Sequence, residues 1–218
     1  MASNALVAGA TGLVGRELVS QLAESKLYNS VHVLTRRHFN IMHPKIISHV
    51  IDFENLEKFK CETAIQDVYV CLGTTIKKAG SQENFKKVDF EYVVTLAKWA
   101  KENKVEKFAL ISSMGANHLS KINFYLRTKG QVEQALQQWN FKNLIILRPS
   151  LLLGEREEFR LAEKISSIIF KPLLPLMMGK MRKYRPVQAR NVAAAMIYFT
   201  NNCDSPVRIV ENIEIIDI

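Results

Sequence analysis

A glycine-rich stretch close to the start of the chain, LVAGATGLVGRELVSQL, places the strongest constraint on the fold. The apolar run Ala5–Ala8 at its beginning is typical of a buried strand. Gly9, Gly12 and Gly15 follow, and apolar residues then recur at helical spacing. A strand, a glycine turn and a helix in this order form a pyrophosphate cradle, because the glycines let the backbone approach the ligand and the helix N-terminus holds the anion. We therefore expect dinucleotide binding, with a purely structural glycine turn as the alternative.

Length and composition limit the classes of protein that fit. The chain has 218 residues, 48% of them hydrophobic, which suits one well-cored domain over 1–218. No apolar run reaches the ~20 residues of a membrane-spanning helix, and the N-terminus shows no signal-peptide pattern. The three cysteines and five histidines have no metal-ligand spacing, so we expect no metal site. These features favour a cytoplasmic location.

The net charge of +9 at pH 7 suits an anionic partner. Nucleic acid, anionic lipid and a phosphorylated cofactor all fit this charge, and the charge alone does not distinguish them. We expect a small-molecule substrate and no nucleic acid, with a membrane-surface contact as a less favoured alternative.

Two arginines follow the second expected strand, Val31–Leu34. In a dinucleotide fold the end of this strand faces the adenosine ribose, where an acidic residue would bind the 2′-hydroxyl of NAD. Arg36 and Arg37 stand there instead and offer planar charged donors for a phosphate monoester. The sequence therefore predicts a preference for NADPH, with a solvated basic loop as the alternative.

The next two expected strands also end in candidate cofactor contacts. Ile46–Ile51 is followed by Asp52, which could accept from the adenine amine or simply cap a helix. The apolar run Val68–Leu72 leads into Gly73, Thr74 and Thr75. A small turn at this position lets the pyrophosphate and nicotinamide ribose approach the backbone.

A Tyr-x-x-x-Lys pair follows the fifth expected strand, Phe108–Ile111, and its Ser-Ser end. Tyr125 and Lys129 share one face of an expected helix, so the ammonium can lie near the phenol. A free tyrosine, with a pKa near 10, is a poor base, and a nearby cation shifts such a pKa downward. Tyrosine can then exchange a proton with a substrate oxygen that a serine hydroxyl also holds.

At this point the sequence resembles the short-chain dehydrogenase/reductase superfamily, and most closely its atypical branch related to the HIV Tat-interactive protein oxidoreductases. The matching segments are, in chain order, LVAGATGLVGREL, LTRR, VIDFENL, CLGTTIKKAG, LISSMGA, NFYLRTKGQVE and ILRPSLLL. The resemblance implies catalytic roles for Tyr125 and Lys129. It also implies cofactor contacts from Thr11, Gly12, Leu13, Val14, Arg36, Arg37, Leu72, Gly73, Pro149, Leu152 and Arg160.

Two departures from the family pattern affect the site. In many extended members the catalytic serine or threonine lies one position later, where this chain has Met114. We therefore assign the role to Ser113, with Ser112 as the alternative. The asparagine that classical members use in a proton relay has no clear match.

The remaining chain is expected to form the substrate side. We predict a substrate lid over 150–186, which contains the apolar stretch IIFKPLLPLMM and a basic cluster at 180–185. A greasy substrate cleft, a membrane-surface contact and a protein-partner site are alternatives for this segment. A helix over Arg190–Asn201 and a final strand over Val207–Ile216 complete the expected chain.

The fold class predicted from these patterns is α/β, a doubly wound and mostly parallel sheet with helices on both faces and a small C-terminal cap. The resemblance implies NADPH-dependent interconversion of a carbonyl and an alcohol. A non-catalytic NADPH-binding redox sensor, acting through a protein partner or as a homodimer, is the alternative. Nucleotide-sugar epimerisation is disfavoured because the C-terminal part looks short for a sugar-nucleotide site.

Overall fold

The computed structural model describes residues 2–37, 42–154 and 179–218. Its main element is a seven-stranded parallel sheet in the order β3-β2-β1-β4-β5-β6-β9. The first strand lies inside the sheet and the chain winds outward from it in both directions, which confirms the predicted doubly wound α/β class. The strands are β1 Ser3–Ala8, β2 Tyr28–Thr35, β3 Ile46–Val50, β4 Asp67–Val70, β5 Lys107–Ile111, β6 Asn143–Arg148 and β9 Val207–Glu211, with a separate parallel pair β7 Leu152–Leu153 and β8 Val187–Gln188.

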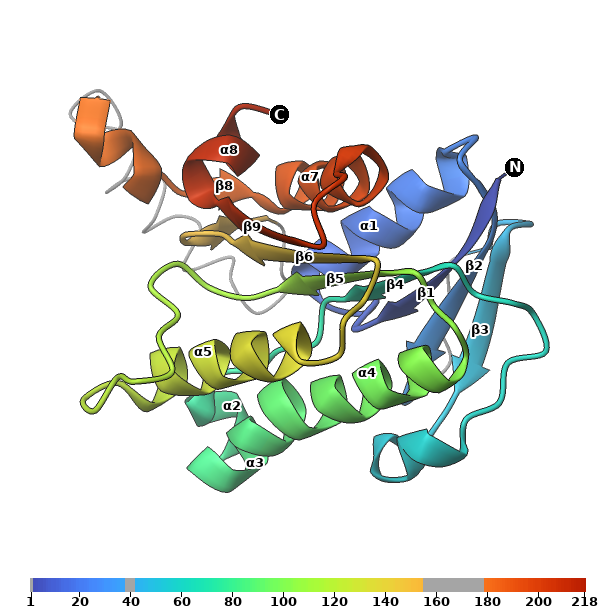
Figure 1. Cartoon of the computed structure of the whole chain (residues 1–218), viewed down its shortest axis with the longest axis horizontal. Helices are drawn as coiled ribbons and strands as arrows, with labels where there is room; N and C mark the ends of the chain where they lie inside the picture. The colour runs from blue at the N-terminus through green and yellow to red at the C-terminus, as the bar shows by residue number, and fades with distance from the viewer. Residues whose placement is uncertain (1, 38–41, 155–178) are drawn as a thin grey trace.

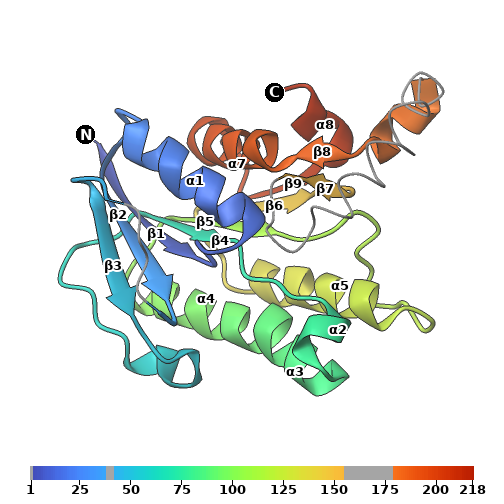
Figure 2. The ribbon, with the colours of Figure 1, turned by 180° about the vertical axis from the view of Figure 1, so that it is seen from behind.

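Helices cover both faces of the sheet, as Figures 1 and 2 show from opposite sides. Helices α1, α7 and α8 lie on one face, and α4 and α5 lie on the other with the short α2 and α3 beside them (Figures 1 and 2). The helices are α1 Leu13–Glu24, η1 Phe53–Lys58, α2 Ile76–Ala79, α3 Gln82–Lys86, η2 Lys87–Glu91, α4 Tyr92–Glu102, α5 Phe124–Gln137, η5 Gly179–Tyr184, α7 Ala189–Asn202 and α8 Asn212–Ile216.

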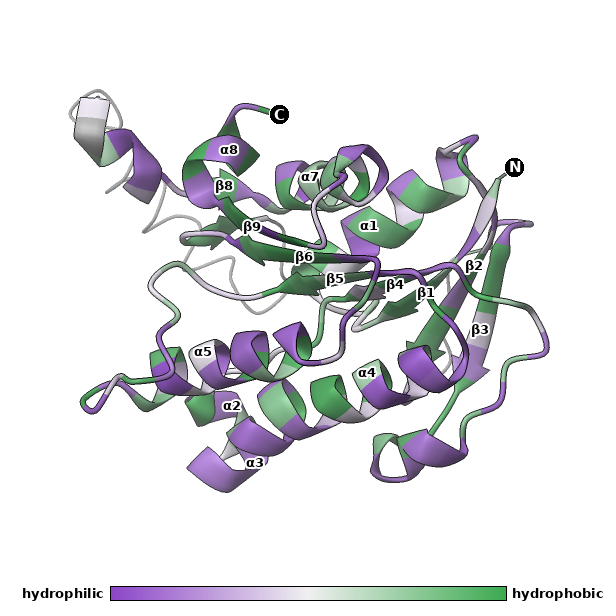
Figure 3. Cartoon of the chain, in the orientation of Figure 1, coloured by the Kyte–Doolittle hydropathy of each residue, from purple (hydrophilic) through white to green (hydrophobic). Residues whose placement is uncertain are grey.

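The strands are apolar on both sides because each face is covered. Successive residues of β1 alternate between the two cores: Val7 belongs to the core under α1 and α7, and Leu6 and Ala8 belong to the core under α4 and α5. Figure 3 shows the hydrophobic strands in the middle of the molecule and hydrophilic positions on the outer sides of the helices.

The helical stretch over residues 82–102 consists of three consecutive pieces, α3, η2 and α4. Between α3 and α4 the chain makes one π-helical segment, η2, which contains the buried residue Asp89. A π-turn widens the helix locally and is frequent at functional sites. Here it brings a carboxylate into the interior of the protein.

The predicted final strand is too long. Strand β9 ends at Glu211, and helix α8 begins directly after it. A capping box explains the change: the Glu211 side chain accepts from the Glu214 backbone N–H, and the Glu214 side chain accepts from the backbone N–H of Glu211. The isoleucines of this segment therefore lie on a short helix. Their spacing in the sequence is compatible with either a strand or a helix, so it did not distinguish the two.

Most of the predicted lid, including Arg160, lies outside the described residues. The described segments before residue 155 and after residue 178 meet in the β7–β8 pair, where Leu152 is in register with Val187. Within the described ranges, no helix has both the length and the apolar character to cross a membrane.

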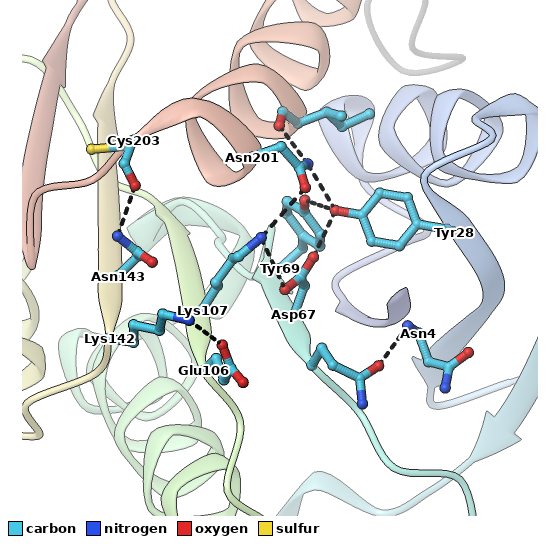
Figure 4. A network of polar contacts seen from close by, with 12 residues as sticks. Asn4, Tyr28, Asp67, Tyr69, Glu106, Lys107, Lys142, Asn143, Asn201 and Cys203 are labelled. Atoms are coloured by element: carbon cyan, nitrogen blue, oxygen red, sulfur yellow. Dashed lines mark hydrogen bonds and ion pairs between the residues drawn. The ribbon is translucent and has the colours of Figure 1, made fainter. Parts of the chain in front are cut away.

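A buried polar network lies where the strands begin, at the opposite end of the sheet from the glycine turn (Figure 4). The Tyr28 hydroxyl donates to Asp67 Oδ2 at 2.8 Å and lies 2.6 Å from the Tyr69 hydroxyl. Lys107 Nζ lies 3.8 Å from Asp67 Oδ1, and Asn201 Nδ2 donates to the Tyr28 oxygen at 3.0 Å. The network joins β2, β4, β5 and α7, and so fixes the sheet at the end remote from the candidate site.

Candidate active site

The glycine turn after β1 is required by close packing at two of its three glycines. Gly9 has φ +89°, and a Cβ there would lie 2.4 Å from the backbone carbon of Cys71. A Cβ on Gly15 would lie 2.2 Å from the Gly9 oxygen. At Gly12 a Cβ would lie 3.2 Å from the Gly9 oxygen, a tight contact that a shift of a few tenths of an ångström would relieve. Packing therefore requires glycine more strictly at positions 9 and 15 than at position 12.

The start of α1 is open to an anion. Gly12 is the N-cap residue of α1 and has no side chain to cap the helix, and the first turn carries no acidic residue. Thr11 is exposed, Leu13 is half-buried and Val14 is buried. The N–H groups and the positive dipole end of this turn can therefore hold a phosphate.

The expected cofactor contacts lie along one edge of the sheet because all the strands are parallel. Ala8 is in register with Leu34 on one side and with Val70 on the other, and Ile111 is in register with Leu147. The segments after β1, β2, β4, β5 and β6 consequently leave the sheet at the same edge, which Figure 2 shows on the side of the β2 and β3 arrowheads and α5. This edge is where ligands bind in open α/β sheets.

Arg36 and Arg37 follow β2 and are both exposed. Asp52 occupies the N-cap of η1, where its Oδ1 accepts from Glu54 N–H at 3.0 Å and its Oδ2 from Asn55 Nδ2 at 2.8 Å. These hydrogen bonds hold the pKa of Asp52 below its usual value. The capping role left open by the sequence is therefore present, and an adenine contact by Asp52 stays a prediction.

The turn after β4 lies directly over the candidate catalytic lysine. A Cβ on Gly73 would be 3.9 Å from Lys129 Nζ and 3.5 Å from Asp89 Oδ1. The Thr74 N–H donates to Asp89 Oδ2 at 2.9 Å, and the exposed Thr75 caps α2 by accepting from Lys78 N–H. Leu72 is half-buried before this turn. The turn therefore leaves open backbone next to a buried positive charge.

Helix α5 carries Tyr125 and Lys129 on one face, four residues apart. Lys129 is 4% exposed, and its Nζ lies 2.8 Å from Oδ1 of the fully buried Asp89. Burial disfavours the charged form of Lys129, but the combined attraction of Asp89, Tyr125 and Glu133 outweighs it, so the pKa of Lys129 lies above its usual value. Tyr125 is half-buried, and its ring packs on Phe85 with 5.6 Å between ring centres. The geometry holds an ammonium ion beside a partly accessible phenol.

Asp89 was missed by sequence reasoning. It follows Phe85 by four residues and precedes Tyr92 by three, so helical spacing puts it on the same face as these two aromatic residues. A carboxylate on such a face needs a buried partner. That position was the signal that could have found it.

The two serines after β5 have different surroundings. Ser112 is buried, and its hydroxyl donates to Glu133 Oε1 in a very short hydrogen bond. Glu133 also accepts from Arg148 Nε at 3.1 Å, and Arg148 Nη1 reaches Glu211 Oε1 at 3.1 Å. Ser113 is half-buried, and among the described residues its hydroxyl makes only a 3.4 Å contact with the Met114 carbonyl. Ser113 is therefore the serine whose hydroxyl is free to meet a substrate.

The loops after β5 and β6 are tied together and approach the glycine turn. Met114 N–H donates to the carbonyl oxygen of the buried Pro149 at 3.0 Å. Leu152 then enters β7, and a Cβ on Gly154 would lie 2.6 Å from Leu13 Cδ1. The segment expected to close over the nicotinamide thus returns to the start of α1.

These residues fit a dinucleotide with a nicotinamide ring. The N–H groups at the start of α1 and the charged lysine under Gly73 are suitable donors for the pyrophosphate and ribose hydroxyls of such a cofactor, and two exposed arginines follow β2 at the same edge. A pyrophosphate can approach the glycine turn after β1 without displacing a side chain at Gly9, Gly12 or Gly15.

Comparison with known proteins identifies similar chains. Residues 5–213 match the model described as "NAD dependent epimerase/dehydratase family". Protein HTATIP2 of Rattus norvegicus is 33% identical over 171 residues, which cover 77% of this chain and 70% of the relative. "Protein FMP52, mitochondrial" of Candida albicans is 40% identical over 157 residues, covering 70% and 68%.

Solved structures agree on the fold. The UDP-glucose 4-epimerase of Thermotoga maritima with UDP-glucose has a TM-score of 0.72 at 17% identity and covers 95% of this chain and 76% of that one. MoeE5 in complex with UDP-glucose and NAD has a TM-score of 0.71 at 16% identity, covering 94% and 74%.

The cytoplasmic location expected from the sequence is wrong. Several relatives are named mitochondrial, including those from Candida albicans and Debaryomyces hansenii. The expectation rested on the lack of a signal-peptide pattern and of a long apolar run, and neither feature distinguishes between compartments inside the cell.

Proposed function

This chain belongs to the NAD dependent epimerase/dehydratase family, an oxidoreductase-type family, and from that premise we propose that it is an NADPH-dependent enzyme that interconverts a carbonyl and an alcohol on a small molecule. The observation that carries the proposal is the position of Lys129, held charged by Asp89 under Gly73 and one helical turn from Tyr125. A buried ammonium at the ligand-binding edge of the sheet serves proton transfer and ribose binding together.

The mechanism assigns each protein group a task at the substrate oxygen. The bound nicotinamide supplies the hydride that reduces the carbonyl carbon. Tyr125 donates its phenolic proton to the oxygen, which becomes the alcohol hydroxyl, and Ser113 donates a hydrogen bond to that same oxygen. Lys129 stabilises the phenolate left behind until solvent returns the proton, and Asp89 keeps Lys129 charged and aimed.

The preference for the phosphorylated cofactor rests on Arg36 and Arg37. Both are exposed after β2, at the edge where the adenosine ribose lies in this fold. Guanidinium groups match a phosphate monoester through paired hydrogen bonds, whereas a 2′-hydroxyl gains little from them. We propose NADPH on this basis.

The relatives' names support a mitochondrial association for this chain. Subcellular fractionation with an antibody to the native chain tests it. Recovery with mitochondria is expected, and recovery in the soluble cytosol alone would contradict it.

A carbonyl panel tests the activity. Purified chain is mixed with NADPH and a series of aldehydes and ketones, and loss of NADPH absorbance is followed. Turnover is expected with at least one carbonyl, and Gly12→Val, which places a side chain in the phosphate cradle, should abolish both turnover and NADPH binding. Tight NADPH binding without turnover across the panel would favour the redox sensor over the enzyme.

A further inference from the structure

A second cluster of chemically reactive side chains lies away from the catalytic residues. It contains His32 on β2, His49 on β3 and Cys61 in the segment after η1. One ligand atom of each residue lies within 4.8 Å of the others. In Figure 1 the chain after η1 passes beside β3 on its way to β4. His49 lies 17 positions and Cys61 lies 29 positions after His32, so the sequence shows no metal-ligand spacing among them.

The distances between donor atoms are close to those of a tetrahedral metal site. His32 Nδ1 lies 2.9 Å from His49 Nε2 and 3.6 Å from Cys61 Sγ, and His49 Nε2 and Cys61 Sγ lie within 4.8 Å of each other. Zinc bond lengths of about 2.0–2.1 Å to nitrogen and about 2.3 Å to sulfur at tetrahedral angles require N···N and N···S separations of roughly 3.3 and 3.6 Å. The His32–Cys61 separation already has this value, and the two imidazoles would need to part by a few tenths of an ångström.

Neighbouring groups orient the ligands. The Ser30 hydroxyl lies 3.1 Å from His32 Nε2, the ring nitrogen that faces away from the cluster. The rings of His32 and His49 stack with 5.2 Å between their centres, and Phe59 packs edge-on against His49. Trp99 Nε1 donates to the Phe59 carbonyl at 2.9 Å and so holds the segment that carries Cys61. Such outer contacts fix the tautomer and direction of a metal-binding histidine.

The cluster is accessible as well as oriented. His32 is buried, whereas His49 and Cys61 are half-buried, so an ion can enter from the side of the latter two. The donor set of two nitrogens and one sulfur suits zinc and excludes magnesium and calcium, which require oxygen ligands.

We propose that His32 Nδ1, His49 Nε2 and Cys61 Sγ bind one Zn²⁺ ion, with the fourth position open to water or an outside ligand. The Cys61 thiol proton passes to solvent as the Zn–S bond forms, and no oxidation or reduction is involved. The ion would join β3 and the segment after η1 to β2, the strand that directly precedes Arg36 and Arg37. The ion would thus hold the β2–β3 edge of the sheet and the segment after η1 together. This role does not depend on the proposed carbonyl chemistry.

Cobalt titration of the protein without an affinity tag tests this proposal. Co²⁺ replaces Zn²⁺ in such sites, and a cobalt–thiolate absorption band reports the sulfur ligand directly. We expect one Co²⁺ per chain with this band, its displacement by one equivalent of Zn²⁺, and a rise in the unfolding temperature with Zn²⁺. Cys61→Ser should remove the band, and His49→Gln should weaken Co²⁺ binding at least tenfold.

Matched variants separate a built site from adventitious binding. Cys203→Ser and His43→Gln change a half-buried cysteine and histidine outside the cluster and should bind Co²⁺ like the parent chain. Circular dichroism in EDTA establishes whether each variant is folded. If Cys61→Ser is unfolded, the Co²⁺ affinity of His49→Gln tests the proposal instead. Absence of the band in the parent chain, or equal binding by the cluster and control variants, overturns the proposal.

Discussion

The Asp89 carboxylate lies 2.8 Å from the Lys129 ammonium, with both side chains withdrawn from solvent. Taking two charges out of water is costly, and the pair is retained at the point where the turn after β4 meets α5. Removal of one partner would leave the other charge buried and uncompensated. The Asp89–Lys129 pair therefore contributes both to the stability of the fold and to the position and charge of Lys129 in the candidate site.

Replacement of Asp89 should destabilise the protein strongly. Asp89→Ala leaves the Lys129 ammonium buried and the Thr74 N–H without its acceptor, so a loss of about 3–5 kcal/mol in the free energy of unfolding is expected. Urea unfolding measures it. The exposed pair Lys98–Glu102, at 4.0 Å, is the control, and Glu102→Ala should cost less than about 1 kcal/mol. Equal effects of the two substitutions would contradict the role given to Asp89.

The two serines after β5 should separate activity from stability. Ser112→Ala removes a buried donor to Glu133 and should lower the free energy of unfolding by about 1–3 kcal/mol. Ser113→Ala should leave stability within about 0.5 kcal/mol and lower kcat, because the proposed mechanism places its hydroxyl at the substrate oxygen. Urea unfolding and steady-state kinetics on both variants check this. The reverse pattern would return the catalytic role to Ser112.

Cofactor choice should depend on the arginines after β2. Arg36→Ala or Arg37→Ala should weaken NADPH binding about tenfold, or about 1.4 kcal/mol, and leave NADH binding unchanged. Fluorescence titration with both cofactors measures the effect, and Arg190→Ala, an exposed arginine on α7, is the control. Equal losses for NADPH and NADH would show that the arginines do not contact the 2′-phosphate.

Much of this arrangement follows from local sequence patterns. The glycine turn, the strand ends and the Tyr-x-x-x-Lys spacing depend on neighbouring residues, so the sequence predicts the parallel sheet and the edge at which its loops meet. The buried positions of Asp89 and Glu133 were not predicted, because their partners come from other helices and strands. The His32 cluster escaped for the same reason, since it forms only when β2, β3 and the segment after η1 are side by side.

The buried carboxylate of Asp67 should make stability fall as pH rises. Burial raises the pKa of Asp67, and the nearby Lys107 only partly offsets this. The folded chain thus retains a proton that the unfolded chain has released, so unfolding becomes easier as pH rises from the usual aspartate pKa toward the folded value. Asp67→Asn should remove this component, which urea unfolding across a pH series measures.

Glu106, a neighbour in the same region (Figure 4), provides the opposite control. A hydrogen bond from Lys142 lowers the pKa of this exposed carboxylate. Its contribution is therefore present above the usual glutamate pKa and lost as pH falls through the folded value. The stability difference between the parent chain and Glu106→Gln should change with pH in the opposite direction to that for Asp67→Asn. Changes of the same sign in both variants would contradict the assignment for Asp67.

Tyr125→Phe tests most directly whether Tyr125 transfers a proton during NADPH-dependent carbonyl chemistry. The substitution removes one hydroxyl and keeps the ring that packs on Phe85, so folding and NADPH affinity should hardly change. Tyr198→Phe, at an exposed position on α7, is the matched control and should retain full activity. The measurement is the rate of NADPH oxidation with an active carbonyl substrate. A fall of roughly 10²–10⁴ in kcat for Tyr125→Phe is the predicted result, and undiminished turnover by this variant would contradict the account.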